Sequence, residues 1–398
     1  MILLADTDIL YENAGELTSS CLDDILEGDY SFFDDENNYT EEYLLEYNFK
    51  TFSDGLTDCI IRHDYNGDIN SAEEKTAFIK NKCNEKNIDL NSSVVKTWFN
   101  DKRPISSERS RENVYKLCFA LGLTIEETSE FFLKVYYECP FNFRIYEELI
   151  YYYCLNNGQS YSSACNLINK AKVILENSKA SQSVYELTTG IETDLKNIHT
   201  DDELLKFISR NSMDFLITNQ TACHHAKRLI DECTALAKNE CQSREELHHK
   251  LGRSGNIDLL IYVLFGEDIL DFKKDRSFSK AAEFPELIKS NFPLKMNLSK
   301  IKNGQKVSYE TMRKSLILLS FYSYYAQLFQ NADYEDFCAL EEDFTDFVCE
   351  TNDLLKTCGY PSLYVRNPFD WLIMHCGSRE YPLDEFRNAL NRYYLDHI

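Results

Sequence analysis

Residues 91–117 gather cationic side chains around a single tryptophan, Trp98, in a chain whose formal net charge is −24. The stretch contains six basic and three acidic residues, which leaves a local charge of +3. Clustered ammonium and guanidinium groups can bind phosphate through charge-assisted hydrogen bonds. The local distribution of charge, rather than the total, therefore bears on whether a polyanion is a partner. The six basic residues are Lys96, Lys102, Arg103, Arg109, Arg111 and Lys116.

The spacing around the tryptophan predicts a short helix over Ser92–Asn100, capped at Asn91 or at its own first residue. Val95, Trp98 and Phe99 recur at i, i+3 and i+4, so we expect them to face a core. The opposite face then carries small polar and basic side chains, which could approach base edges and phosphates in a major groove. These outward residues are Ser93, Lys96, Thr97 and Asn100.

Four cations follow in the loop and at the start of the next predicted helix. They could neutralise backbone phosphates, which would give affinity and salt dependence rather than sequence choice. They are Lys102, Arg103, Arg109 and Arg111.

The run "VVKTWFNDKRPISSERSRENVYKLCFALGLTIEETSEFFLKVY" resembles the lambda-repressor-like (XRE-type) helix-turn-helix domain. The resembling features are a tryptophan-bearing third helix, a basic loop with Pro104, and an arginine–valine–leucine pattern that ends at Leu121-Gly122-Leu123. The preceding helix, "FIKNKCNEKN", departs from the family because it lacks the usual Gln-x-x-Leu-Ala opening.

The resemblance implies a cytoplasmic bacterial transcriptional regulator that binds double-stranded DNA without a cofactor. Its third helix would enter the major groove, which assigns DNA contacts to Ser92, Ser93, Lys96, Thr97 and Asn100. A non-enzymatic helical protein-interaction module, such as a component of a phage-defence or mobile-element system, is the alternative. The acidic character of the chain favours this second hypothesis.

The elements that position these residues are predicted to be helices throughout, so the expected fold class is all-α. Only 13 Gly and 7 Pro interrupt 398 residues, and no alternating strand pattern is found. Helix starts are predicted from Ser71 with Glu74, Thr124 with Glu127, Ser243 with Glu246, and Asn367 before Pro368.

Four segments are expected. Residues 51–175 form the helix-turn-helix domain, 176–200 a linker, and 201–398 a helical domain for sensing, self-association or a protein partner. Residues 1–50 contain fourteen acidic residues and one basic residue, a charge of −13. This extension either aids solubility or folds over the basic surface and competes with phosphate.

The stretch Asn297–Leu319 partly echoes the first motif, with a short helix, a basic loop and a capped helix. Either it is a second, degenerate DNA-contacting unit or it is a solvated helix-loop-helix. Its basic residues are Lys300, Lys302, Lys306, Arg313 and Lys314.

No catalytic residue, metal site or membrane segment is predicted. Phosphate-loop, dinucleotide-binding and nucleophile-elbow motifs are not found. Cys233 and Cys241 are too far apart along one helix to share a zinc ion, so the histidine pairs nearby are expected to lie on helix surfaces. The acidic cluster in 266–275 and the pair Cys358 and His375 are weak catalytic candidates. The fourteen cysteines are expected to be reduced, and the N-terminus lacks the basic region of a signal peptide.

Overall fold

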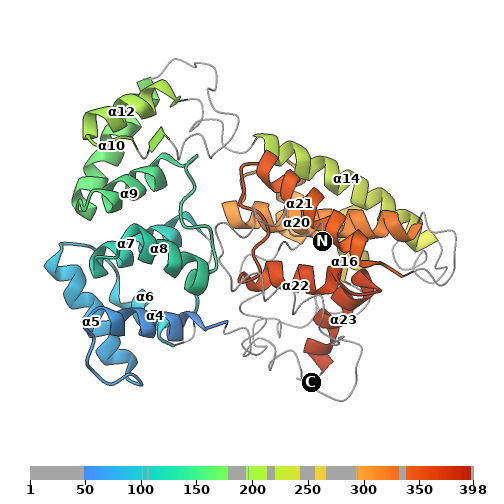
Figure 1. Ribbon diagram of the computed structural model, residues 1–398, viewed down its shortest axis with the longest axis horizontal. Coiled ribbons are helices and arrows are strands. Elements are labelled where there is room, and N and C mark those ends of the chain that lie inside the picture. The colour runs from blue at the N-terminus through green and yellow to red at the C-terminus, as the bar shows by residue number, and fades with distance from the viewer. Residues whose placement is uncertain are drawn as a thin grey trace. The chain divides into compact units, whose positions relative to one another are not determined.

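The computed structural model describes residues 49–100, 102–104, 107–177, 194–195, 197–212, 220–242, 256–265, 293, 295–330 and 338–395. Within these ranges the protein is all-helical, as predicted, and no β-strand occurs (Figure 1). None of the helices in the described ranges combines the length and apolar character needed to cross a bilayer.

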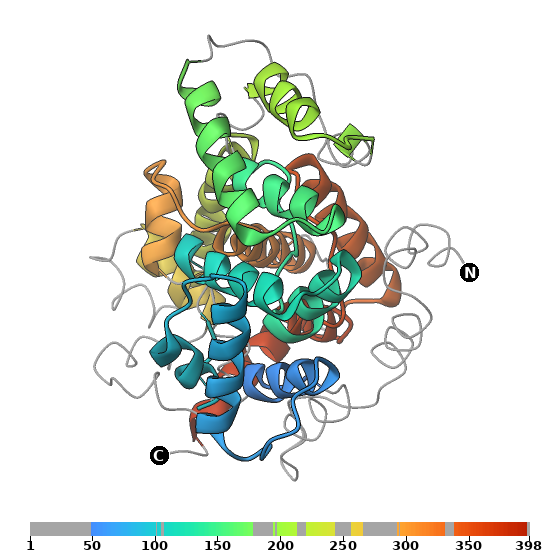
Figure 2. The same cartoon turned by 90° about the vertical axis from the view of Figure 1, so that its left-hand side faces the viewer.

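The chain divides into two compact units. The N-terminal unit is Lys50–Gln220, and the C-terminal unit extends from Thr221 onward and also includes Phe49. Figure 2 gives a second view of the helices of the N-terminal unit, blue to light green by the colour bar. These helices are α4 (Phe52–Arg62), α5 (Ala72–Glu85), α6 (Ser92–Trp98), α7 (Glu108–Leu121), α8 (Ile125–Phe131), the π-helical turn η1 (Phe132–Tyr136), α9 (Tyr146–Asn156), α10 (Tyr161–Asn177) and α12 (Asp201–Arg210).

The helices of the C-terminal unit surround one long, largely buried helix, α20. They are α14 (Gln220–Gln242), α16 (Asn256–Phe265), α19 (Lys295–Lys302), α20 (Tyr309–Gln330), α21 (Glu341–Thr357), α22 (Pro368–Gly377) and α23 (Pro382–Leu395).

Helix α12 belongs to the N-terminal unit, because it packs against α10. The sequence interpretation had placed everything from residue 201 onward in the C-terminal domain. The unit boundary lies instead at Thr221. The polar stretch that begins at Glu176 was visible in the sequence, but the packing of α12 back onto α10 was not.

Side-chain caps begin several helices where the sequence predicted them. Thr124 and Glu127 form a reciprocal capping box at the start of α8. The Ser71 side chain caps α5, although Glu74 accepts a hydrogen bond from the amide of Asp68 rather than from the cap residue. Asn367 caps α22, whose first residue is proline.

Several sequence predictions lie outside the described residues, among them most of the linker expected over 176–200. The others are the acidic extension up to residue 48, the cap at Ser243 with Glu246, and the cluster in 266–275.

The core of the N-terminal unit is aromatic. Phe52 in α4 makes edge-to-face contacts with Trp98, Phe131 and Tyr136, with ring centroids 5.6, 5.7 and 6.1 Å apart. α4 also lies against η1 so closely that a Cβ added at Gly55 would come within 2.6 Å of the Val135 side chain. These contacts fix the helices on which the candidate surface is built.

Candidate nucleic-acid interface

Helices α5 and α6 are consecutive in the N-terminal unit and pack against one another. α5 ends at Glu85 with Lys86 as its C-cap, and Asn87 follows with a φ of +54°, in the left-handed region. The Lys86 ammonium group donates to the carbonyl oxygen of Phe119 at 2.9 Å, which joins the turn to α7. The Asn91 side chain accepts from the amide of Ser93 and so caps α6.

One face of α6 is anchored in the core, as the spacing predicted. Val95 and Trp98 are each 2% exposed, and Phe99 is 6% exposed. The Trp98 ring lies edge-to-face against Phe52. Burial of this large side chain holds α6 at a fixed angle, so its opposite face is presented rigidly.

The opposite face of α6 is open to solvent. Ser93, Lys96, Thr97 and Asn100 are exposed, and Ser92 is half-buried. Lys96 forms an ion pair with Glu73 of α5, Nζ to Oε1 at 2.8 Å. The hydrogen bond from Lys96 lowers the pKa of Glu73 below its usual value. A phosphate near Lys96 would therefore have to compete with this exposed carboxylate.

The loop after α6 carries two cations with different environments. Lys102 is exposed, and its backbone amide donates to the carbonyl oxygen of Thr97 at 3.0 Å. The Arg103 guanidinium lies over the rings of Tyr137 and Tyr136, at 5.0 and 5.8 Å from their centroids. Arg103 is therefore half-buried and held by aromatic contacts, whereas Lys102 extends into solvent.

Arg109 and Arg111 differ although they lie in the same turn of α7. Arg109 is exposed, as a phosphate contact requires. Arg111 is only 6% exposed and does not share the surface with the other predicted residues. The prediction of a phosphate contact at Arg111 is wrong, because its guanidinium already binds two carboxylates inside the protein.

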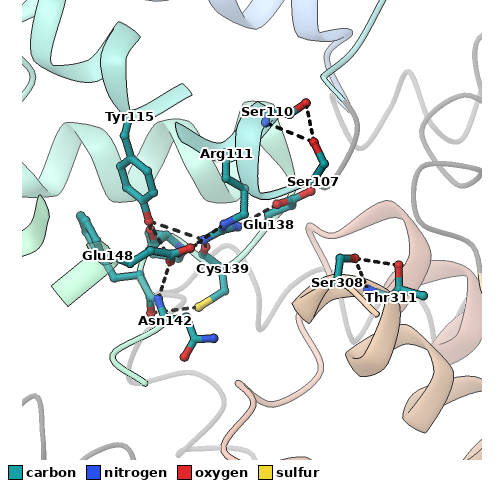
Figure 3. A network of polar contacts seen from close by, with 12 residues as sticks. Ser107, Ser110, Arg111, Tyr115, Glu138, Cys139, Asn142, Glu148, Ser308 and Thr311 are labelled. Carbon is teal, nitrogen blue, oxygen red and sulfur yellow. Dashed lines mark hydrogen bonds and ion pairs between the residues drawn. The ribbon is translucent and has the colours of Figure 1, made fainter. Parts of the chain in front are cut away.

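Figure 3 shows the polar network around Arg111. Its Nε donates to Oε1 of Glu148 at 2.8 Å, and its Nη2 donates to Oε2 of Glu148 at 2.8 Å and to the carbonyl oxygen of Cys139 at 2.9 Å. Its Nη1 donates to Oε2 of Glu138 at 2.7 Å. We call Arg111, Glu148 and the Cys139 carbonyl the first arginine clasp.

Electrostatics explain why this buried cation is tolerated. Burial alone would lower the pKa of Arg111, but the carboxylates of Glu148 and Glu138 raise it well above its usual value. Glu148 also accepts hydrogen bonds from the Tyr115 hydroxyl at 3.0 Å and from the Asn142 amide at 2.8 Å. The clasp thus ties α7 to the loop before α9 and to α9 itself.

The helical spacing of α7 in the sequence indicates that Arg111 is buried, although the sequence prediction placed it at the surface. Arg111 precedes the buried residues Val114 and Tyr115 by three and four positions, so it lies on the same face of α7 as the core residues. Arg109 is rotated away from that face. The periodicity that correctly placed Val95 and Trp98 therefore also separates the two arginines.

The weaker candidates behave as buried structural residues where they are described. Burial raises the pKa of Cys358 to about 12, and burial together with Arg379 lowers the pKa of His375 to about 3. A nucleophilic cysteine needs a lowered thiol pKa, and its histidine base must be able to take up a proton near neutral pH. The shifts at Cys358 and His375 run in the opposite directions. Cys233 is fully buried and donates to the carbonyl oxygen of Leu319. In the described part of the chain, no three His, Cys, Asp or Glu side chains converge as metal ligands would.

Comparisons of this chain with protein-family models, with curated proteins and with solved structures find no match.

Proposed function

We propose that the N-terminal unit binds double-stranded DNA through the exposed face of α6, and that the protein is a DNA-binding transcriptional regulator. The observation that carries this proposal is the two-sided character of α6. Val95 and Trp98 fix its inner face in the core, while Ser93, Lys96 and Thr97 are exposed on the other face. A rigid helix with small polar side chains can approach base edges closely.

The cations around α6 supply the non-specific part of this binding. Lys96, Lys102 and Arg109 are exposed and could each lie near a backbone phosphate. Arg103 would contribute through its position over Tyr137 rather than as a fully solvated charge. Arg111 has no part in the proposed contact.

The test is binding of the full-length protein to a mixed-sequence DNA duplex at increasing salt concentration. Replacement of Lys96 and Lys102 by alanine together should weaken binding and lower the slope of log K against log salt by about 0.9 for each lost phosphate contact. The control replaces Lys170 and Lys172, two exposed lysines of α10, by alanine. The control has the same change in net charge, so we expect it to keep the wild-type slope.

A protein-interaction module is the second candidate function. The ion pair between Lys96 and Glu73 favours it, because this pair reduces the positive charge available on α6. Ile61 and Ile69 are also exposed in the same unit, at 45% and 55%. Undetectable binding of the wild-type protein to duplex DNA at low salt would overturn the DNA proposal and leave this one.

A further inference from the structure

The C-terminal unit contains a second arginine clasp. Arg313 of α20 donates from Nη1 to Oδ1 of Asp370 at 2.9 Å and from Nη2 to Oδ2 at 2.6 Å. It also donates to the backbone carbonyl oxygens of Pro361 at 3.3 Å and Ser362 at 2.8 Å. Oδ2 of Asp370 accepts from the amide of Tyr364 at 3.0 Å, just as Glu148 accepts an amide in the first clasp. In both units, a buried arginine joins a central helix to a proline-containing loop and to the helix that follows it.

The acidic partners of the two clasps occupy the same helical position. Glu148 is the third residue of α9, and Asp370 is the third residue of α22. An arginine precedes each acid by four residues, and a buried cysteine follows each acid by six. These residues are Arg144 and Cys154 in the N-terminal unit, and Arg366 and Cys376 in the C-terminal unit.

The helices that carry the arginines begin in the same way. Ser107 caps α7, and its hydroxyl donates to the hydroxyl of Ser110 at 3.0 Å. Ser308 accepts from the amide of Thr311 at 3.2 Å, and the two hydroxyls lie 2.8 Å apart. Figure 3 shows both of these capping pairs.

The short helix and loop before each capped helix also correspond. The carbonyl oxygen of Thr97 near the end of α6 accepts from the amide of Lys102, five residues later, at 3.0 Å. The carbonyl oxygen of Lys300 in α19 accepts from the amide of Gln305, also five residues later, at 2.8 Å. The same backbone hydrogen bond, from the amide of residue i+5 to the carbonyl oxygen of residue i, therefore follows both short helices.

The buried apolar residues of the short helices have the same spacing in both units, and the spacing seen in α7 also occurs within the almost wholly buried first half of α20. Each short helix buries two apolar residues three positions apart, and each central helix buries apolar residues three and six positions after its arginine. The pairs are Val95 and Trp98 with Leu298 and Ile301 in the short helices, and Val114 and Leu117 with Leu316 and Leu319 in the central helices. The correspondence is not residue for residue, because Arg111 follows its cap residue Ser107 by four positions and Arg313 follows Ser308 by five.

We infer that this chain contains the same helix–loop–helix module twice, and that α19 with its loop forms a second surface that binds the phosphates of duplex DNA. This inference rests on the function proposed for α6. The stretch 295–306 contains four lysines and no acidic residue, in a chain of charge −24. The surface is therefore a local exception to the acidic character of the protein, as is the surface around α6.

The four lysines of this second surface differ in their surroundings. Lys295 and Lys302 form ion pairs with Asp258 and Asp231. Lys306 is exposed and Lys300 is half-buried. Lys227 of α14 adds a further ammonium group beside the loop, since its Nζ would lie 3.1 Å from a Cβ added at Gly304.

Two basic residues of this region are excluded from the surface. Arg313 is engaged in the clasp and is 3% exposed. Lys314 is 4% exposed and its ammonium group lies 5.1 Å from the centroid of the Phe369 ring. The sequence had counted both among the basic residues of this region, but both belong to the core.

The test compares three double variants of the full-length protein in the salt titration with a mixed-sequence duplex. The first-surface variant is Lys96→Ala with Lys102→Ala, and the second-surface variant is Lys300→Ala with Lys306→Ala. The control is Lys238→Ala with Lys356→Ala, two exposed lysines of α14 and α21 in the C-terminal unit. Circular dichroism and thermal unfolding establish that all three variants fold like the wild type.

We expect the second-surface variant to lower the salt slope by up to about 1.8, at about 0.9 per lost contact, while the control keeps the wild-type slope. If only the first-surface variant loses slope, the second surface does not bind DNA, and the function proposed for α6 stands. If the salt slope of the control falls as much as that of the second-surface variant, the effect is one of net charge and the inference is overturned. If the wild type binds no duplex at low salt, the proposed function fails and the inference fails with it.

Discussion

The guanidinium of Arg111 and the carboxylate of Glu148 face one another across two hydrogen bonds of 2.8 Å each. Their residues are 37 positions apart in the sequence and belong to α7 and α9. Both side chains are 7% exposed. The pair lies inside the N-terminal unit, so its contribution is to the packing of that unit and not to a surface contact.

Removal of one partner of this clasp should destabilise the N-terminal unit strongly. Arg111→Ala leaves two carboxylates buried without their cation, which costs about 3–5 kcal/mol for a buried pair. Urea unfolding followed by tryptophan fluorescence measures this cost. A Trp371→Phe background leaves Trp98 as the reporter of the N-terminal unit, because the chain contains 2 Trp.

Arg109→Ala is the matched control, since it removes the same side chain two residues earlier from an exposed position of α7. We expect it to change the free energy of unfolding by no more than about 0.5 kcal/mol. An equal loss of unfolding free energy in the two variants would contradict the structural role assigned to Arg111.

The pH dependence of the C-terminal unit should include a contribution from His375. Burial, with Arg379 nearby, lowers its pKa from 6.5 to about 3, so the folded unit holds this imidazole neutral. Between these two values the unfolded chain binds a proton that the folded unit does not. The contribution of His375 to the free energy of unfolding is therefore fully present above pH 6.5, and it is lost as the pH decreases towards about 3.

The measurement is urea unfolding between pH 7 and pH 4 in a Trp98→Phe background, where Trp371 reports the C-terminal unit. His375→Gln should flatten the acid side of the profile by up to about 1.4 kcal/mol per pH unit, the value for one proton. Parallel wild-type and variant profiles would show that His375 does not titrate in this window.

The turn between α5 and α6 should tolerate glycine at position 87 but not a β-branched residue. Asn87 has a φ of +54°, which a β-branched side chain adopts only at a cost of about 1–2 kcal/mol. We expect Asn87→Gly to fold with near wild-type stability and Asn87→Val to lose stability by that amount in the urea experiment. Similar midpoints for the two variants would show that the turn adjusts to another conformation.

Thiol reactivity should separate the buried cysteines of the N-terminal unit from the partly exposed ones. Burial raises the pKa of Cys59 to about 12, and burial likewise raises the pKa of Cys118. Both should therefore resist alkylation at neutral pH in the folded protein and react in urea. Peptide mass spectrometry measures the labelling, and we expect the half-buried Cys139 and Cys165 to react before the buried cysteines. Rapid labelling of Cys118 in the native protein would contradict the packing of α7.

The sequence alone determined the all-α class and the local helix signals. The caps at Thr124 and Asn367 were predictable because they involve residues two or three positions apart. The inner face of α6 was predictable for a similar reason, since Val95 and Trp98 follow the helical period. The helix was expected to reach Asn100, but it ends at Trp98 and Asn100 belongs to the turn that follows.

Only the tertiary structure decided which carboxylates pair with the buried cations. Arg111 and Arg313 were grouped with exposed basic residues, because local charge density says nothing of a carboxylate that is distant in the sequence. Their partners, Glu148 and Asp370, are 37 and 57 residues away. The desolvation cost of a buried guanidinium is offset only where folding brings such a carboxylate within hydrogen-bonding distance. Side-chain periodicity is a local property of the chain, whereas the pairing of buried charges depends on how distant helices pack.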